Sequence, residues 1–143
     1  MTTRSDKYTI ERSKREHFSD FLTNLDRNPV TGYLARAVDR QAIEISLRNI
    51  ILTNRGEWPF ESAVGSKIRA SLFELGNDPR DVDEIRNSIS EAIRMLEPRV
   101  DLVDLGVNYN NTDFNRLYVS IYYTILNIPS ETFQFDIAIS RVR

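Results

Sequence analysis

The sequence predicts an α+β fold, in which N-terminal helical segments are followed by a three-stranded antiparallel sheet packed on the helices. Apolar residues recur at helical spacing up to Leu96, and from Leu105 onward they alternate with other residues at the period of a strand. Between these two patterns lies Pro98, which lacks an amide hydrogen and disfavours helical geometry at the preceding residue. The chain is therefore expected to change from helix to strand at Glu97-Pro98-Arg99.

The chain is expected to divide into a flexible N-terminal arm, residues 1–16, and a single domain, residues 17–143. The first segment is rich in charges of both signs and has too little apolar area to offset the entropy of ordering it. The next apolar residues recur at helical spacing and predict a short helix, which either folds onto the main core or anchors a neighbouring subunit. These residues are Phe18, Phe21, Leu22 and Leu25. A turn cluster follows at residues 28–32.

Three longer helices are predicted before the corner. The first begins at Asp39 and continues to the region of Gly56, a glycine of the kind that follows helix C-termini. The second spans residues 66–75, with a serine as its N-cap. The third begins with the capping-box pattern of Asp81 and Glu84 and ends at the corner. Its apolar stripe consists of Val82, Ile85, Ile89, Ala92, Ile93 and Leu96.

Three strands are predicted after the corner, because apolar residues alternate along 105–109, 117–125 and 133–139. Turn-rich residues at 110–115 and at Pro129-Ser130 separate them. This pattern is typical of an antiparallel meander with one buried face. In the last strand, the side chains expected to face the core are Phe133, Phe135, Ile137 and Ile139, with Gln134, Asp136 and Ala138 on the opposite face.

Composition limits the classes of function. The chain has 143 residues, a net charge of −2 and no cysteine, so there is no basic excess to favour nucleic acid and no thiolate metal ligand or nucleophile. No apolar run approaches the length of a membrane span, and no signal peptide is visible, so we expect a protein made and assembled in the cytoplasm, without a membrane partner. The single histidine, His17, offers no metal cluster, and the five glycines are scattered. We therefore expect no cofactor and no metal.

Glu97 is unusual at the end of a helix, because a carboxylate there faces the negative end of the helix dipole. It requires a cation, and Arg94 and Arg99 are the nearest candidates. Two interpretations are open: an ion pair that fixes the helix–strand corner, or a rigid charged corner presented to a partner through Glu97, Pro98 and Arg99. If the corner is not deeply buried, Glu97→Gln should change the stability by no more than about 1–2 kcal/mol while impairing assembly.

The Glu-Pro-Arg tripeptide and the pattern upstream of it resemble the lysozyme-like baseplate wedge family of contractile phage tails, which includes the corresponding subunit of type VI secretion baseplates. The residues that carry this resemblance, beside the tripeptide, are Thr53, Gly56, Pro59, Phe60, Gly65 and Leu72-Phe73-Glu74. It covers roughly residues 39–143, with one departure at Trp58, where the family often has arginine.

The resemblance implies a structural subunit of the baseplate wedge that sits in the virion tail beside the tail tube. It would join the other wedge subunits to the first ring of the tail sheath protein, and it could also contact tube or hub proteins. Its C-terminal strands would template sheath assembly by strand exchange. The alternatives are a peptidoglycan-degrading lysozyme of the same particle and a free cytoplasmic adaptor.

A lysozyme requires two carboxylates about 5–9.5 Å apart, one of them with a raised pKa. Glu97 could be the acid, with Asp101 or Asp104 as its partner. A general acid needs an apolar pocket, however, and the neighbouring arginines should lower the pKa of Glu97 instead. We therefore expect no catalytic residues.

Two further surfaces are candidates for binding a partner. Trp58 lies in an apolar loop that either covers the core or anchors an interface. The last strand is expected at an edge of the sheet, where unpaired backbone groups near Gln134 or Asp136 can accept a strand from another chain. The competing interpretation is that Arg141 and Arg143 protect this edge from aggregation.

Overall fold

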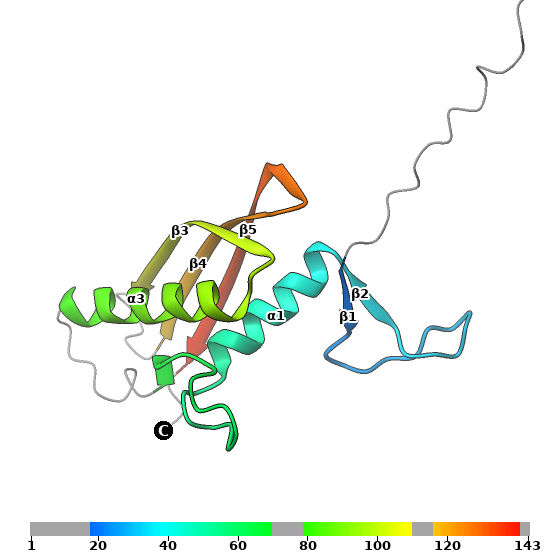
Figure 1. Cartoon of the computed structure of the whole chain (residues 1–143), viewed down its shortest axis with the longest axis horizontal. Helices are drawn as coiled ribbons and strands as arrows, with labels where there is room; N and C mark the ends of the chain where they lie inside the picture. The colour runs from blue at the N-terminus through cyan, green and yellow to red at the C-terminus, as the bar shows by residue number, and fades with distance from the viewer. Residues whose placement is uncertain (1–17, 70–78, 110–115, 141–143) are drawn as a thin grey trace, which may run out of the picture.

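The structure is a computed structural model that describes residues 18–69, 79–109 and 116–140 (Figure 1). Its named elements in chain order are β1 (Ser19–Phe21), β2 (Arg36–Val38), α1 (Arg40–Leu52), α3 (Pro79–Leu96), β3 (Val100–Tyr109), β4 (Arg116–Ile125) and β5 (Ile128–Ser140). Strands β1 and β2 form a two-stranded antiparallel sheet. The other three strands form an antiparallel meander in the order β3-β4-β5.

The meander buries one face, as the alternation predicted. Every second residue of β4 is buried, and β4 lies between two hydrogen-bonded neighbours. On β5 the alternation is also as predicted: Ile137 and Ile139 are buried, Phe133 and Phe135 pack partly buried against the core, and Gln134, Asp136 and Ala138 are exposed. A slip of one residue would expose these apolar side chains, so the register of β5 is fixed.

Helices α1 and α3 supply the other half of the core. Their buried stripes pack against the inner face of the sheet in one cluster. Its helical members are Ile43, Leu47, Ile51, Ile85, Ile89 and Ile93, and the strands contribute Leu105, Val107, Leu117, Val119, Ile121, Tyr123 and Ile125, among others. The α+β class is confirmed, but the helices-first order is only partly right, because β1 and β2 precede α1.

The short helix predicted from Phe18 to Leu25 is wrong. The backbone pairs instead as β1 with β2, with Asp20 opposite Ala37. Phe21 and Leu25 are exposed, so the helical spacing does not mark a buried face. About one and a half turns cannot form a stable helix alone, and hydrogen bonds to a neighbouring strand satisfy the backbone here.

Three boundaries also differ from the prediction. Helix α1 ends at Leu52 rather than near Gly56, and α3 begins at Pro79, which places Asp81 in its first turn rather than at its N-cap. The chain turns at residues 126–127, not at Pro129-Ser130. Ile125 pairs with Ile128 and Thr124 with Thr132, so residues 129–131 form a bulge, a position that tolerates proline in a strand. The helix predicted over 66–75 lies mostly outside the described residues, as do the N-terminal arm, His17, Arg141 and Arg143.

Candidate partner-binding site

The helix–strand corner contains a buried carboxylate. Helix α3 ends at Leu96, and the Glu97 amide still donates to the Ile93 carbonyl at 2.9 Å. The Val100 amide then donates to the Glu97 carbonyl at 3.3 Å, which closes the turn around Pro98. The side chain of Glu97 is only 1% exposed. The corner is therefore part of the core, although Pro98 at its apex is exposed.

Arg99 is the cation that Glu97 requires. Its Nε lies 2.5 Å from Oε1 of Glu97 and its Nη2 lies 2.6 Å from Oε2, so both carboxylate oxygens accept hydrogen bonds. Burial alone would raise the pKa of Glu97, but hydrogen bonds from Arg99 and from Ser46 of α1 outweigh it, and this pKa is lowered. The same pair raises the pKa of Arg99. Glu97 is therefore a buried anion held by Ser46 of α1 and by Arg99, the residue just before β3.

Arg99 also connects the corner to the N-terminal hairpin. Its Cζ lies 5.2 Å from the centre of the Phe18 ring, a cation–π contact. The Phe18 amide donates to the Asp39 carboxylate at 3.2 Å, and the Asp39 amide donates back to the Phe18 carbonyl at 2.8 Å. The Arg99 carbonyl accepts from the Leu126 amide at 3.1 Å. One arginine thus joins the end of α3, the base of the hairpin and the β4–β5 turn.

These contacts decide between the two candidate cations and show that one condition of the stability prediction is not met. Arg99 pairs with Glu97, whereas Arg94 is exposed on α3. The corner is also deeply buried, so the condition under which Glu97→Gln would cost little is not met. Because the Glu97 carboxylate is inside the protein, Pro98 and the half-buried Arg99 are the parts of the tripeptide that another chain can touch.

The apolar loop between α1 and residue 66 is an ordered structure, which we call the Trp58 loop (residues 53–66). The Ser66 amide donates to the Thr53 carbonyl at 2.8 Å, and the Arg55 amide donates to the Ser66 carbonyl at 3.1 Å, so the ends of the loop are tied together. Trp58 is 56% exposed and Phe60 is 99% exposed. The interpretation of this loop as a cover over the core is therefore wrong, and its aromatic side chains face solvent.

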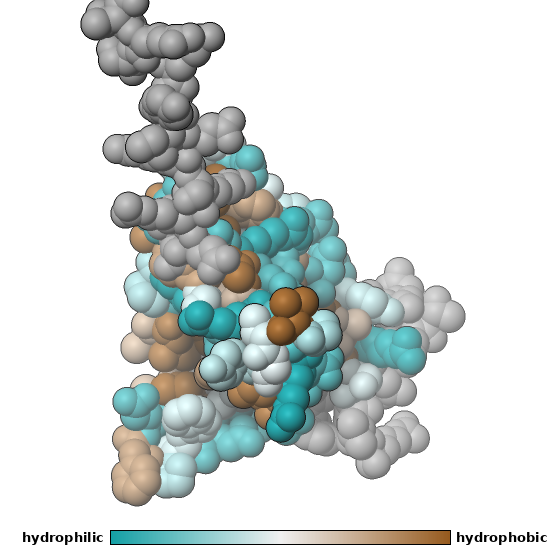
Figure 2. Space-filling model, turned by 90° about the vertical axis from the view of Figure 1, so that its right-hand side faces the viewer, coloured by the Kyte–Doolittle hydropathy of each residue, from teal (hydrophilic) through white to brown (hydrophobic). Residues whose placement is uncertain are grey.

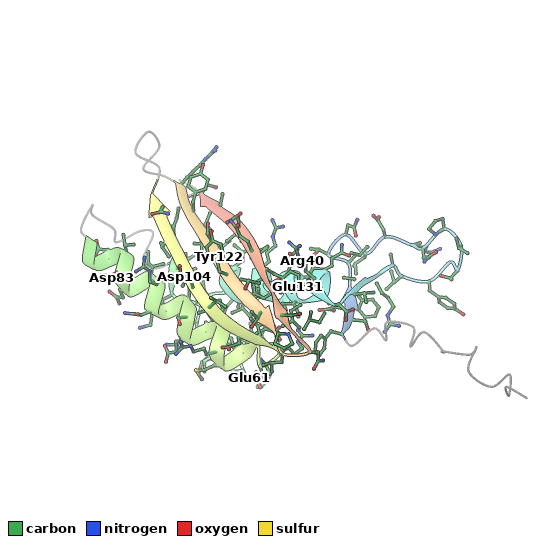
Figure 3. The ribbon with its side chains drawn as sticks, turned by 90° about the horizontal axis from the view of Figure 1, so that it is seen from above. Arg40, Glu61, Asp83, Asp104, Tyr122 and Glu131 are labelled. Carbon is green, nitrogen blue, oxygen red and sulfur yellow. The ribbon has the colours of Figure 1, made fainter. Side chains whose placement is uncertain are left out.

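Within the described residues, strand β5 forms one edge of the meander, since β4 is its only neighbour in the sheet there. Arg40, on α1, donates from Nη2 to the Gln134 carbonyl at 3.4 Å, and Figure 3 shows Arg40 beside this strand. A carbonyl that meets a helix side chain points away from β4. Backbone groups two residues apart point the same way in an antiparallel strand, so those of Gln134 and Asp136 both face outward.

The side chains along this edge interact with one another and with α1. Hydrogen bonds from Ser120 and Gln134 lower the pKa of Asp136, although its carboxylate is exposed. The Gln134 amide group lies 2.9 Å from one Asp136 oxygen. The Cζ atom of Arg40 lies 5.3 Å from the centre of the Phe133 ring, and its Nε lies 2.6 Å from Oε1 of Glu44. The edge is thus bordered by a cation, Arg40, and an anion, Asp136.

Within the described residues, no cluster of three or more His, Asp or Glu side chains could hold a metal ion. In the same part of the chain, neither helix has the length and apolarity needed to cross a bilayer.

Comparison with known proteins assigns this chain to a family. The pattern of the family described as baseplate wedge protein gp25 matches residues 37–130. This chain belongs to that family. The baseplate wedge protein gp25 of Enterobacteria phage T4 is 28% identical over 107 residues, which are 75% of this chain and 80% of that protein.

Two solved structures are similar to this baseplate wedge family member. One is a chain of the anti-feeding prophage baseplate, with a TM-score of 0.66 and 26% identity over 78% of this chain and 87% of that chain. The other is a protein from Geobacter sulfurreducens named as a tail lysozyme, with a TM-score of 0.62 and 24% identity over 71% of this chain and 89% of that chain. The second similarity concerns the fold alone. The suspected family is confirmed.

Three residues that complete the site were not found from the sequence. Ser46 binds Glu97, Phe18 lies against Arg99, and Arg40 contacts the β5 edge. Each acts over a long sequence separation, 94 residues for Arg40 and Gln134, and no local pattern marks it. The structure brings Glu97 and Arg99 together, and Gln134 and Asp136 together, as predicted from their spacing.

Proposed function

We propose that this chain is a structural subunit of a contractile-tail baseplate wedge, assembled in the host cytoplasm and carried in the virion tail. It joins the wedge core to the first ring of the tail sheath and templates sheath assembly through its C-terminal strands. The observation that carries this proposal is the open edge of β5. Membership of the baseplate wedge family and the similarity to an anti-feeding prophage baseplate chain support the setting.

The β5 edge has the properties that strand addition requires. It is long, spanning Ile128–Ser140, and alternate burial keeps it in one register. The outward amides of Gln134 and Asp136 would keep a constant spacing for an incoming strand. Arg40 occupies the Gln134 carbonyl at 3.4 Å, so an incoming strand must displace a partly exposed side chain at this point.

The helix–strand corner and the Trp58 loop are the surfaces that we assign to contacts with other wedge subunits. Pro98 and Arg99 present a surface whose shape is fixed by the buried Glu97. Trp58 and Phe60 present two aromatic side chains on a loop with tied ends, and aromatic residues of this kind are frequent binding hot spots. These two surfaces would hold the subunit in the wedge while β5 remains open to the sheath.

Proline at an outward amide tests the templating role. Gln134→Pro and Asp136→Pro each remove one outward N–H donor while leaving the β4–β5 ladder intact, and each should slow sheath initiation by about tenfold or more. The measurement is sheath assembly on preformed baseplates that contain the variant. Both variants should still melt cooperatively and enter baseplates.

Alanine at the same two positions is the matched control. Gln134→Ala and Asp136→Ala remove the side chains but keep the N–H groups, so sheath initiation should stay near the wild-type rate. If both proline variants fold, enter baseplates and initiate sheath normally, templating by this edge is wrong. If the alanine variants are as defective as the proline variants, side chains rather than the backbone are recognised.

We also infer that the lysozyme-like fold serves assembly and not hydrolysis. The pKa of Glu97 is lowered, and Arg99 occupies both of its oxygens, so this group cannot hold the proton that a general acid must donate. The purified protein should therefore release no reducing sugars from peptidoglycan above a buffer control. Release that disappears in Glu97→Gln but not in Glu91→Gln, a variant of an exposed glutamate, would contradict this inference.

A further inference from the structure

The β1–β2 hairpin (residues 19–38) projects from the body of the protein beyond the start of α1 (Figure 1). Its connection is ordered by backbone hydrogen bonds along its length. The Leu22 amide donates to the Ala35 carbonyl at 3.3 Å, and the Ala35 amide donates to the Asp26 carbonyl at 2.7 Å. Arg27 and Leu34 form a further antiparallel bridge. The hairpin is therefore a narrow finger of defined shape.

The tip of the hairpin is closed by Asn28. Its backbone carbonyl accepts from the Gly32 amide at 2.8 Å, and its amide donates to the Tyr33 carbonyl at 2.7 Å. Its side-chain oxygen also accepts from the Val30 amide at 2.9 Å. Gly32 has φ +72°, which glycine adopts without steric cost. The side chains around this turn are consequently displayed at fixed positions.

The displayed side chains are apolar and exposed. Val30 is 90% exposed and Tyr33 is 78% exposed. The other large exposed apolar side chains of the hairpin are Phe21, Leu25 and Leu34. Figure 2, which views the molecule from the side of the hairpin, shows hydrophobic residues at the surface among polar ones. A single exposed apolar residue is ordinary, but five on one projecting hairpin make it a candidate interaction surface.

Leu25 gives an independent indication. Its backbone has φ +53°, in the left-handed region that a bulky side chain rarely adopts. Its side chain is also exposed, so burial does not compensate for this backbone conformation. Glycine or asparagine would suit the turn better. Nothing within the described residues compensates for leucine at this position, which is consistent with a role for its side chain at the surface.

The charges of the hairpin indicate the class of partner. Asp20 and Asp26 are balanced by Arg27 and Arg36, so the finger has no net charge that would attract phosphate groups or an anionic bilayer. A convex apolar finger is complementary to a concave apolar groove in another protein. Among the described residues outside the hairpin, the most exposed aromatic side chains, Trp58 and Phe60, lie on the Trp58 loop, so we take the receptor to be a different chain rather than a second copy.

We propose that the tip of the β1–β2 hairpin inserts into an apolar groove on a different protein chain of the assembled baseplate, with Val30 and Tyr33 as its central contacts. This proposal rests on the proposed function, because it places the chain in a baseplate. The hairpin lies almost entirely outside residues 37–130, the part of the chain that matches the family pattern. Its direction is fixed at the base by the bonds between Phe18 and Asp39 and by the Arg99–Phe18 contact. The partner groove would meet a preorganised finger, which reduces the entropic cost of binding.

Thiol protection tests this contact, because the chain contains no cysteine. Val30→Cys introduces a single thiol at the tip, and its reaction with a maleimide is measured in the free protein and in intact baseplates. Protection of about tenfold or more in the baseplate is expected, with full reactivity restored when the baseplate is dissociated. Reaction at the free rate in intact baseplates would overturn the proposal, whereas failure of the wild-type chain to enter baseplates at all would overturn the proposed function instead.

The identity of the partner is tested by cross-linking the same thiol to nearby lysines in purified baseplates. A product that joins this chain to a different baseplate protein supports the proposal, whereas a product of two copies of this chain overturns it. The double variant Val30→Ser with Tyr33→Ser should compete with wild type for incorporation at least about tenfold less well, at an unchanged melting temperature. Val103→Ser, at an apolar position on β3 that is 58% exposed, is the control and should compete as well as wild type. Equal competition by the double variant would also overturn the proposal.

Discussion

Glu97→Gln is expected to lower the free energy of unfolding by about 3 kcal/mol, near the lower end of the range of about 3–5 kcal/mol for breaking a buried ion pair. Both oxygens of the Glu97 carboxylate accept hydrogen bonds from Arg99, and the side chain is almost completely buried. Glutamine offers one oxygen and an NH₂ group that cannot accept from Arg99. The effect lies at the lower end because Arg99 keeps part of its surface in water.

The matched control is Glu91→Gln on the same helix. Glu91 pairs with Arg55 at 3.2 Å, but its side chain is mostly exposed, so the loss should be within about 1 kcal/mol. Both variants are compared with wild type by urea unfolding monitored by circular dichroism. Equal, small losses for the two variants would mean that the Glu97–Arg99 pair does not stabilise the corner.

Acid unfolding provides a second measurement on the same variant. The pKa of Glu97 is lowered in the folded protein, so its contribution to stability is complete above the ordinary glutamate value of about 4.3 and is lost as the pH falls through the folded value. Wild type should therefore lose stability more steeply than Glu97→Gln below about pH 4.3. Parallel pH profiles would contradict the assignment of this acid sensitivity to Glu97.

The corner shows which parts of the fold the sequence could predict. The end of α3 at Leu96 follows from Pro98, because a proline ring acts on its immediate neighbours. The faces of β5 follow from strict alternation at Phe133, Phe135, Ile137 and Ile139, because the period of a strand decides burial once one face is covered. Both effects are local, and both predictions are confirmed.

The burial of Glu97 could not be predicted in this way. It depends on α1, which brings Ser46 to the carboxylate, and on the hairpin, which brings Phe18 to Arg99. In the local sequence Arg94 and Arg99 are equally plausible partners, and only the turn geometry selects Arg99. The hairpin could not be predicted because its first apolar residues have helical spacing. Its backbone conformation is determined instead by pairing with a distant strand, with Asp20 opposite Ala37, 17 residues away.

The Trp58 loop is closed by an unusually close backbone approach at Gly65. A Cβ atom at this position would lie 2.4 Å from the Thr53 carbonyl oxygen and 2.9 Å from its carbon. The residue also has φ +105°, a conformation that residues with side chains rarely adopt. The neighbouring amide of Ser66 donates to the same Thr53 oxygen at 2.8 Å, so a side chain at Gly65 would push apart the bond that ties the loop.

Gly65→Ala is therefore expected to destabilise the protein by about 3 kcal/mol, since backbone strain and a steric clash each contribute about 1–3 kcal/mol. Gly56→Ala is the control, because Gly56 has φ +84° in the same loop but a methyl group added there would meet no atom within 4 Å. It should cost only the strain, about 1–2 kcal/mol. The difference between the two alanine variants isolates the close approach of Gly65 to Thr53. Equal stability of the two variants would show that glycine is needed at position 65 for its backbone angle alone.

Fluorescence of Trp58 separates opening of the loop from global unfolding, because Trp58 is the single tryptophan of the chain. If Gly65→Ala opens the loop, this fluorescence should change before the global transition that circular dichroism records. Incorporation into baseplates should fall with it, because Trp58 and Phe60 would no longer be held in one position. An early fluorescence change with normal incorporation would mean that the aromatic pair does not contact another wedge subunit.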